Sequence, residues 1–486
     1  MTPETAIVAA LVLPLVGALG IALAGKIPNL REAVTLTTAV ALFACVVQLL
    51  DPVLAGGRPE LILLEPLPGL PIAFRVEPLG MIFALVASGL WIVNSVYSIG
   101  YMRGNKEQHQ TRFYVCFALA IAAALAIAFA ANLLTLFLFY EVLTLITYPL
   151  VTHAGTDKAK QGGRVYLAIL MGTSILFLLP AVIYTWHVAG TTDFRVGGIL
   201  PADMDTVSVA VLLALFMFGI GKAALMPFHR WLPAAMVAPT PVSALLHAVA
   251  VVKAGVFTVV KVIVYIFGLD QLAGATDWLV AIAGFTIIAA SVVALHADNL
   301  KRRLAYSTVS QLSYVILAAA LLAPLSVVAA ALHIAAHALG KITLFFAAGA
   351  IYTAAHKTEI SQLDGIGRRM PWTMVAFSIG ALSMIGLPPA AGFISKWYLV
   401  SGAMAQAHWF ALAVILASTL LNAAYFMPII YRAFFRPLSA EALAHPHGEA
   451  PLAIVLALSV TAAGTLALFF FPDIPLTLAQ QLVAAP

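Results

Sequence analysis

Three titratable side chains lie in one apolar stretch of this sequence. The run HIAAHALGKITLFF, residues 333–346, carries His333, His337 and Lys341. Spacings of four residues place side chains on one face of a helix, and eight residues at 1.5 Å each make a line about 12 Å long. Because imidazoles titrate near neutral pH, such a line with waters between its members can pass protons along. Hydrogen-bonded packing of the histidines between helices is the alternative.

Further charged residues interrupt other apolar stretches. They comprise one acid and four lysines: Glu141, Lys222, Lys253, Lys261 and Lys396. A lysine at the centre of a membrane-spanning helix costs about 2.5 to 3.5 kcal/mol on insertion scales, so each one needs a function or a partner. A buried ammonium group can release and regain a proton, and a nearby carboxylate favours its charged form. An acid that approaches or leaves a lysine therefore acts as a proton switch.

Glu141 and Lys222 are the candidates for such a pair. A static salt bridge is the alternative for the buried lysines, and a packing role at a helix end is the alternative for Glu141. Lys261 lies near the outer end of its predicted helix and is expected to snorkel to the interface. His247 follows the same reasoning as the histidines of the 333–346 run.

Composition places these groups in a membrane. The chain has 486 residues, of which 63% are hydrophobic and 9% are charged, against about 25% charged in soluble domains. Its apolar blocks are about 20 residues long, which suits helices rather than barrel strands. The net charge of +5 does not gather on a soluble face, so we expect no nucleic-acid partner.

Motifs for cofactors or metals are missing from the sequence. Two cysteines without ligand spacing are too few for an iron–sulfur site, and no glycine-rich nucleotide loop occurs. His445 and His447 flank a proline, which favours a partner-facing loop over a metal site. We therefore expect no bound cofactor and no metal, and no redox or hydrolytic site.

The apolar runs predict an all-α polytopic protein with fourteen transmembrane helices. The predicted spans are residues 4–25, 33–50, 77–100, 112–130, 133–152, 164–188, 207–227, 242–267, 274–295, 304–323, 327–354, 371–400, 406–434 and 451–471. Between the second and third spans, two short apolar runs around a Pro-Gly pair predict an extramembrane hairpin.

The distribution of basic residues predicts the orientation. Of the 25 Lys and Arg residues, seventeen lie in loops after odd-numbered spans, five lie within spans, and only Arg58, Arg75 and Arg195 follow even-numbered spans. The positive-inside rule then places the odd loops in the cytoplasm and both termini outside. We expect a multi-pass protein of the bacterial or archaeal cytoplasmic membrane.

Two predicted helices are interrupted by proline next to a lysine. The seventh contains FGIGKAALMPFHRWLP, with Pro227 after Lys222, and the twelfth contains MIGLPPAAGFISKWYLV, with Pro388 and Pro389 before Lys396. Proline removes a backbone hydrogen bond, which is tolerated in a membrane where the freed carbonyl faces protein or a water-filled cavity. Broken helices in corresponding places of two halves indicate a transport site in a transporter with inverted repeats. A simple packing kink is the alternative.

Several long motifs in order resemble a known family. They are GKAALMPFHRWLPAAMVAPTPVSALLHAVAVVKAGVF, LKRRLAYSTVSQLSYVIL, HALGKITLFFAAG and GLPPAAGFISKW. These motifs resemble the antiporter-like subunits shared by Mrp-type sodium/proton antiporters, respiratory complex I and membrane-bound hydrogenases. Within that family the chain is most similar to the D-type Mrp subunit, because only about 15 residues follow the last predicted helix. The carboxylate in FRVEPLGMIF is Glu77, where the family usually has aspartate.

The resemblance implies a domain organisation. The fold would have two inverted five-helix repeats, helices 4 to 8 and 9 to 13, with helices 7 and 12 broken. In this sequence that gives a single transmembrane domain, residues 1–486, divided into residues 1–111 with the hairpin, repeats at 112–267 and 274–434, and a last helix at 451–471.

The resemblance also implies roles for single residues. Glu141 matches the acid of helix 5, Lys222 the lysine of helix 7 that it switches, and Lys253 the central lysine of helix 8. His333, His337 and Lys341 would continue a hydrophilic axis to Lys396, with His247 beside it.

These observations predict a proton- or cation/proton-translocating subunit of a multisubunit Mrp-type antiporter. Its partners would be other membrane subunits, the lipid bilayer, protons and possibly Na⁺. One alternative is a pump subunit of a quinone-reducing or hydrogen-evolving redox complex. Others are a stand-alone solute transporter and a structural subunit whose charges form static ion pairs.

Overall fold

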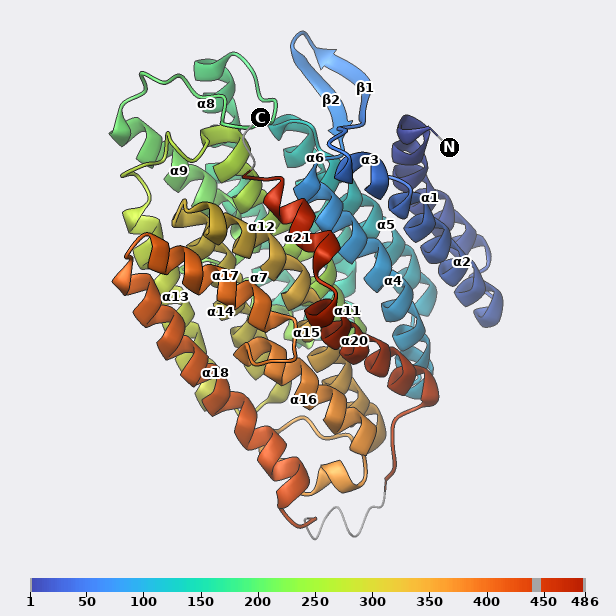
Figure 1. Ribbon diagram of the computed structural model, residues 1–486. Helices are drawn as coiled ribbons and strands as arrows, with labels where there is room; N and C mark the ends of the chain where they lie inside the picture. The colour runs from blue at the N-terminus through green and yellow to red at the C-terminus, as the bar shows by residue number, and fades with distance from the viewer. Residues whose placement is uncertain (1, 439–446, 484–486) are drawn as a thin grey trace.

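The computed structural model describes residues 2–438 and 447–483. His445, one of the two histidines of the predicted partner-facing loop, lies outside these residues. Figure 1 shows a bundle of helices, with both ends of the chain at the end that carries the β-hairpin. The described part of the chain contains eleven helices that are long and apolar enough to cross a membrane. The molecule is therefore a helical membrane protein.

The first third of the chain contains the hairpin and the helices around it. Its elements are α1 (Pro3–Leu23), α2 (Pro28–Val47), α3 (Leu50–Leu54), β1 (Glu60–Leu67), β2 (Leu70–Arg75), α4 (Pro78–Gly104), α5 (Gln110–Phe129) and α6 (Leu133–Val151). The strands pair antiparallel with Glu60 opposite Arg75, which confirms the predicted hairpin. Proline at the start of α1, α2 and α4 supplies a preset backbone angle where no donor is needed.

The middle of the chain is helical but repeatedly irregular. Its helices are α7 (Asp157–Thr173), α8 (Leu179–Ala189), α9 (Thr206–Gly219), α10 (Trp231–Ala234), α11 (Thr240–Ala244) and α12 (Val251–Val262). Wider π-type turns join α7 to α8 and α11 to α12. Such turns occur mostly at functional sites. The predicted break in the seventh helix is present, because eleven residues lie between the end of α9 and the start of α10.

The last part of the chain contains the longest described helix, α15, among helices of very different length. They are α13 (Asp277–His296), α14 (Leu300–Ala320), α15 (Pro324–Ala355), α16 (Pro371–Ile385), α17 (Gly392–Ala405), α18 (Trp409–Phe435), α20 (Leu452–Phe470) and α21 (Asp473–Gln480). The predicted break in the twelfth helix separates α16 from α17. The short helix α21, which the apolar pattern did not predict, packs against α4 and α15.

Two helical stretches form the centre of the bundle. Residues Thr240–Phe267 are buried along their whole most apolar stretch, and Pro324–Ala355 is almost as deeply buried. The outer helices α1, α18 and α20 are only about one third buried, as expected for helices that face lipid. The two central stretches are enclosed by other helices rather than by lipid, because almost all of their residues are buried within the protein. The lysines and histidines of α12 and α15 are therefore held far from bulk solvent.

Candidate functional site

Lys222 lies on the break between α9 and α10, with its side chain wholly buried. Its ammonium donates to the Tyr140 carbonyl at 2.8 Å and to the Thr144 hydroxyl at 2.5 Å. It also lies 3.3 Å from the centre of the Tyr140 ring. Both partners belong to α6, so the interrupted helix is fastened to α6 through this lysine.

Glycines let the backbone around Lys222 come close to its neighbours. A Cβ on Gly255 of α12 would lie 2.3 Å from the Lys222 carbonyl carbon, and one on Gly221 would lie 2.2 Å from the Thr173 hydroxyl. The Trp231 indole donates to the Gly221 carbonyl at 2.9 Å. The irregular segment is thus tightly packed between α7 and α12, with one of its freed carbonyls satisfied by a side chain.

Glu141 also lies on α6, next to Tyr140. Its two carboxylate oxygens are buried and have no hydrogen-bond partner among the described residues. No ion pair within 4.0 Å joins it to Lys222 in the part of the chain that the structure describes. The structure brings the segment of Lys222 against α6, which carries Glu141, but Lys222 bonds to the neutral oxygens of Tyr140 and Thr144 in this conformation. The carboxylate is available to a partner that approaches it.

Lys253 joins the two central helices. Its ammonium nitrogen lies 2.6 Å from Nδ1 of His337, and both side chains are buried. The sequence separates these residues by 84 positions. Lys253 comes from α12 and His337 from α15, so the contact connects the two halves of the bundle at its centre.

The line of titratable groups continues from His337 to His333. The two rings lie 5.9 Å apart. Nδ1 of His333 lies 2.8 Å from the Ser395 hydroxyl, and Nε2 lies 3.1 Å from the Gln311 side-chain oxygen. Both ring nitrogens of His333 are therefore bonded, and one bond leads to α17.

Lys396 follows Ser395 directly in the sequence and sits at the second helix break. Its ammonium donates to the carbonyl of Ile385, the last residue of α16, at 2.8 Å. It also lies 4.8 Å from the centre of the Tyr314 ring. Gly386 has φ +87°, and a Cβ there would lie 2.5 Å from Cδ of Lys396. The break therefore supplies both the carbonyl acceptor and the space for the lysine.

Lys341 points away from this line. It donates to the Ser307 hydroxyl at 2.7 Å and to the Leu304 carbonyl at 3.3 Å, both on α14. The Tyr425 hydroxyl of α18 also reaches Ser307, at 2.9 Å. Lys341 thus starts from the same face of α15 as the histidines, but its side chain turns toward α14. The polar contacts continue from there to Tyr425 on α18.

His247 lies in the π-type turn before α12. Its ring lies 4.7 Å from the ring of Phe345 on α15. Both of its nitrogens are buried without a partner among the described residues. The structure places it beside α15, the helix that carries His333, His337 and Lys341.

The expectation that Lys261 snorkels to the interface is wrong. Its side chain is wholly buried, and its ammonium lies 3.1 Å from a carboxylate oxygen of Glu77. It also donates to the Ala130 carbonyl at 2.6 Å. Since Glu77 caps the start of α4, the ion pair ties α12 to α4 and α5. The sequence gave no signal that Lys261 and Glu77 pair, because the two residues are distant from each other along the chain.

The arrangement is a buried chain of proton-carrying groups between two helix breaks. The groups in contact are Lys253, His337 and His333, with Ser395 leading to Lys396, while Lys222 lies at the other break and bonds to α6. Ammonium, imidazole and hydroxyl groups can each exchange a proton with a neighbour or with a water between them. Ionisable groups inside a membrane bundle mark ion pathways.

Two family models match parts of this chain. Residues 130–422 match a family model described as NADH:quinone oxidoreductase/Mrp antiporter, TM. Residues 69–114 match one described as NADH-Ubiquinone oxidoreductase (complex I), chain 5 N-terminus. The first of these alone covers more than half of the chain.

Two curated relatives and one solved structure illustrate the similarity. The chain is 34% identical to NADH-quinone oxidoreductase subunit N of Desulforudis audaxviator, over 76% of this chain and 74% of the relative. It is 29% identical to a Na⁺/H⁺ antiporter subunit of Alkalihalophilus pseudofirmus, over 90% of this chain but only 57% of the relative. A chain of the Mrp complex from a Dietzia species has the same fold, with a TM-score of 0.87, 22% identity, and coverage of 99% of this chain and 97% of that chain.

Proposed function

The chain belongs to the NADH:quinone oxidoreductase/Mrp antiporter family of transmembrane proteins, and we propose that it is an ion-translocating subunit of a multisubunit Mrp-type cation/proton antiporter. The single observation that carries the proposal is the contact of Lys253 with His337, 2.6 Å apart at the buried centre of the bundle. The fold shared with a chain of a Mrp complex supports the same assignment.

The proposed architecture has fourteen transmembrane helices. Eleven are long and apolar enough by themselves. The other three are the broken helix formed by α9 and α10, the helix α14, and the broken helix formed by α16 and α17. The two broken helices are interrupted beside a buried lysine, and α14 is more polar. Residues 112–267 and 274–434 form two inverted five-helix repeats, each with one broken helix. Residues 1–111 and 451–471 flank them.

The proposed orientation places both termini outside the cell. The loops after odd-numbered helices carry most of the lysines and arginines, which favours the cytoplasm for them. The ends of the chain and the hairpin lie together at the opposite end of the bundle (Figure 1). The protein would sit in a bacterial or archaeal cytoplasmic membrane beside other membrane subunits.

In the proposed mechanism, Lys222 loads and releases a proton as Glu141 of this chain approaches or withdraws. In the conformation described, Tyr140 and Thr144 hold the lysine. The proton then passes through Lys253, His337 and His333 toward Lys396. Half-channels for the ions would open at the two breaks. Exchange of H⁺ for another cation requires that the two half-channels do not conduct at the same time.

A transport assay with variants of Lys222 tests the mechanism. We expect Lys222→Ala to abolish cation-driven proton movement in inverted vesicles, with normal assembly of the complex. Thr144→Val, which removes one ligand of the lysine at constant volume, should slow transport about tenfold, the effect of one lost hydrogen bond to a charged group. Thr185→Val is the matched control, because this buried hydroxyl bonds only to the carbonyl of Ala181 in its own helix. Full activity in Lys222→Ala would refute the mechanism.

A second candidate function is a pump subunit of a redox complex. The observation that favours it is the 34% identity to an NADH-quinone oxidoreductase subunit over three quarters of each chain. Affinity purification of the tagged chain from its native membrane, with mass spectrometry of the co-purifying subunits, separates the two. Small hydrophobic subunits and antiporter-like chains indicate an antiporter. Flavin or iron–sulfur proteins indicate a redox pump, and recovery of the chain alone indicates a stand-alone transporter.

A further inference from the structure

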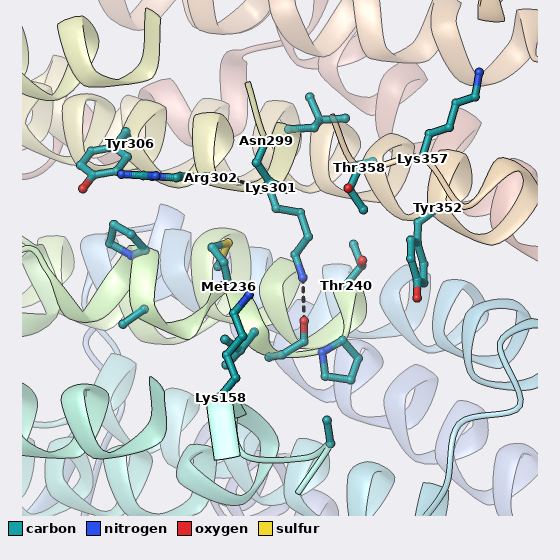
Figure 2. A pocket seen from close by; sticks show the side chains of 18 of the residues that line it. Lys158, Met236, Thr240, Asn299, Lys301, Arg302, Tyr306, Tyr352, Lys357 and Thr358 are labelled. Atoms are coloured by element: carbon teal, nitrogen blue, oxygen red, sulfur yellow. Dashed lines mark hydrogen bonds between the residues drawn. The ribbon is translucent and has the colours of Figure 1, made fainter. Parts of the chain in front are cut away.

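A cavity of about 900 Å³ opens at the end of the bundle away from the hairpin. Figure 2 shows side chains from several helices converging on it. They come from the end of α4, the start of α7, the segment between α10 and α11, the start of α14 and the end of α15. Five cations line the cavity: Lys158, Arg230, Lys301, Arg302 and Lys357. Among the described lining residues, Glu107 is the one acid.

The cations of the cavity are not neutralised by the described parts of the chain. None of the five forms an ion pair within 4.0 Å with a described carboxylate. Lys301 donates to the Ala238 carbonyl at 2.6 Å, drawn as the dashed line in Figure 2. Lys357 donates to the Gln362 carbonyl at 2.9 Å. These acceptors are neutral, so the positive charge of the cavity remains available to a ligand.

The backbone adds to the positive potential. Helix α14 starts at Leu300 beside two of the cations, and Asn299 is its N-cap. The N-terminus of a 21-residue helix attracts anions through its dipole, while the N–H groups of Leu300 and Arg302 are already bonded to the Thr358 carbonyl and the Asn299 side chain. Thr240 and Thr358 place hydroxyl groups on the same wall. The cavity thus combines charged donors, neutral donors and a helix end.

The positive-inside rule does not account for this arrangement. That rule explains an excess of lysine and arginine at the cytoplasmic end, but a surface placement with carboxylates between them would satisfy it equally well. Here five cations line one hollow whose volume lies within the range of ligand sites, about 300 to 1,000 Å³, and one of them, Lys357, turns its ammonium away from the centre of the hollow. The field inside it repels Na⁺ and favours an anion.

We propose that this cavity binds a phosphate-bearing anion, either a soluble phosphate compound or a phospholipid head group. Phosphate oxygens accept several charge-assisted hydrogen bonds at once, and the two arginines can each bind two oxygens with parallel donors. The proposal concerns binding at the mouth of the bundle. It does not depend on which ion the central chain of lysines and histidines moves.

Titration of the purified complex with inorganic pyrophosphate at constant ionic strength tests the proposal. We expect saturable binding that Lys158→Gln weakens about tenfold, the effect of one charge-assisted bond. Lys160→Gln is the matched control. It removes the same charge from the same turn of α7, but Lys160 is paired with Asp157 at 3.6 Å and does not line the cavity. Equal binding by the two variants would refute the proposal.

Native mass spectrometry of the same preparations distinguishes the source of the phosphate. If the ligand is a phospholipid head group, a phospholipid should stay bound to the wild type and to Lys160→Gln. The same phospholipid should be lost from the double variant Lys158→Gln with Lys301→Gln. Pyrophosphate binding without such a lipid identifies a soluble phosphate compound. A cross-link from Lys301 to an acidic segment of a neighbouring subunit, with neither phosphate ligand bound, would overturn the proposal.

Discussion

The ammonium of Lys253 and Nδ1 of His337 lie 2.6 Å apart and join two helices that are far apart in the sequence. A charged lysine can only donate, so Nδ1 accepts and the imidazole proton then lies on Nε2, which has no partner among the described residues. A neutral lysine can accept from Nδ1–H instead. Transfer of one proton therefore reverses the direction of the bond without moving either helix.

Replacing His337 should interrupt transport at this contact. His337→Ala removes the acceptor of Lys253 and one member of the line, so we expect a loss of about 100-fold in the proton-transport rate, typical of a lost proton-transfer group. His296→Ala is the control, because this exposed histidine at the end of α13 bonds only to the Val292 carbonyl of its own helix. The rate is measured by a pH-sensitive dye in inverted vesicles. Similar rates in the two variants would contradict the role of His337.

The ion pair of Glu77 and Lys261 should matter for stability. Glu77→Gln leaves the Lys261 charge buried without its carboxylate, and breaking a buried pair in this way costs about 3 to 5 kcal/mol. We expect a clearly lower midpoint of thermal unfolding for the assembled complex. Glu77→Gln with Lys261→Met should regain most of the loss, because no charge then remains unpaired.

A neighbouring pair supplies the control for that measurement. Glu60 binds Arg75 at 3.1 Å, but its side chain is 39% exposed. Exposed pairs contribute about 0 to 1 kcal/mol, so Glu60→Gln should leave the midpoint almost unchanged. If Glu77→Gln lowered the unfolding midpoint no more than Glu60→Gln does, the ion pair would not be what stabilises the buried charge of Lys261.

Close packing at the first helix break makes Gly255 sensitive to a single methyl group. A Cβ there would lie 2.3 Å from the Lys222 carbonyl carbon, so Gly255→Ala must displace the backbone that carries the lysine. Overpacking of this kind costs about 1 to 3 kcal/mol, and we expect transport to fall with stability. Gly172→Ala is the comparison, since a Cβ at Gly172 meets nothing within 4 Å. Transport by vesicles and thermal unfolding of the complex check both variants.

Anion binding in the basic cavity should weaken as the pH rises. Burial lowers the pKa of Lys301, which precedes the predicted tenth span, to about 7, against the opposing effect of Glu107. Burial also raises the pKa of Glu107. Raising the pH through neutrality therefore removes a positive charge from Lys301, and this loss disfavours an anion.

The conservative variant Lys301→Arg separates this effect from ionisation of the probe itself. Arginine stays charged throughout the range, whereas the other cations around the cavity, Lys158, Arg230, Arg302 and Lys357, are unchanged. Pyrophosphate affinity measured from pH 6 to pH 9 should fall more steeply for the wild type than for Lys301→Arg. Parallel curves would show that Lys301 does not titrate in this range.

The positions of most long helices, of the hairpin and of the two breaks could be predicted from the sequence. Apolar blocks of about 20 residues and the Pro-Gly pair act locally, so their consequences do not depend on distant parts of the chain. The spacing of His333, His337 and Lys341 likewise placed them on one face of α15. The short helix α21 was missed because it is too short and too mixed in composition for an apolar-run criterion.

The partners of the buried charges were decided only by the tertiary structure. Lys222 bonds to Tyr140 and Thr144 rather than to Glu141, and Lys341 turns to Ser307. Lys261 is paired with Glu77 instead of reaching the interface. Residue types and spacing show that a buried charge needs a compensating group, because leaving it alone in the membrane is costly. Which group supplies it depends on how helices distant in the sequence pack together and on the direction in which each side chain leaves its helix.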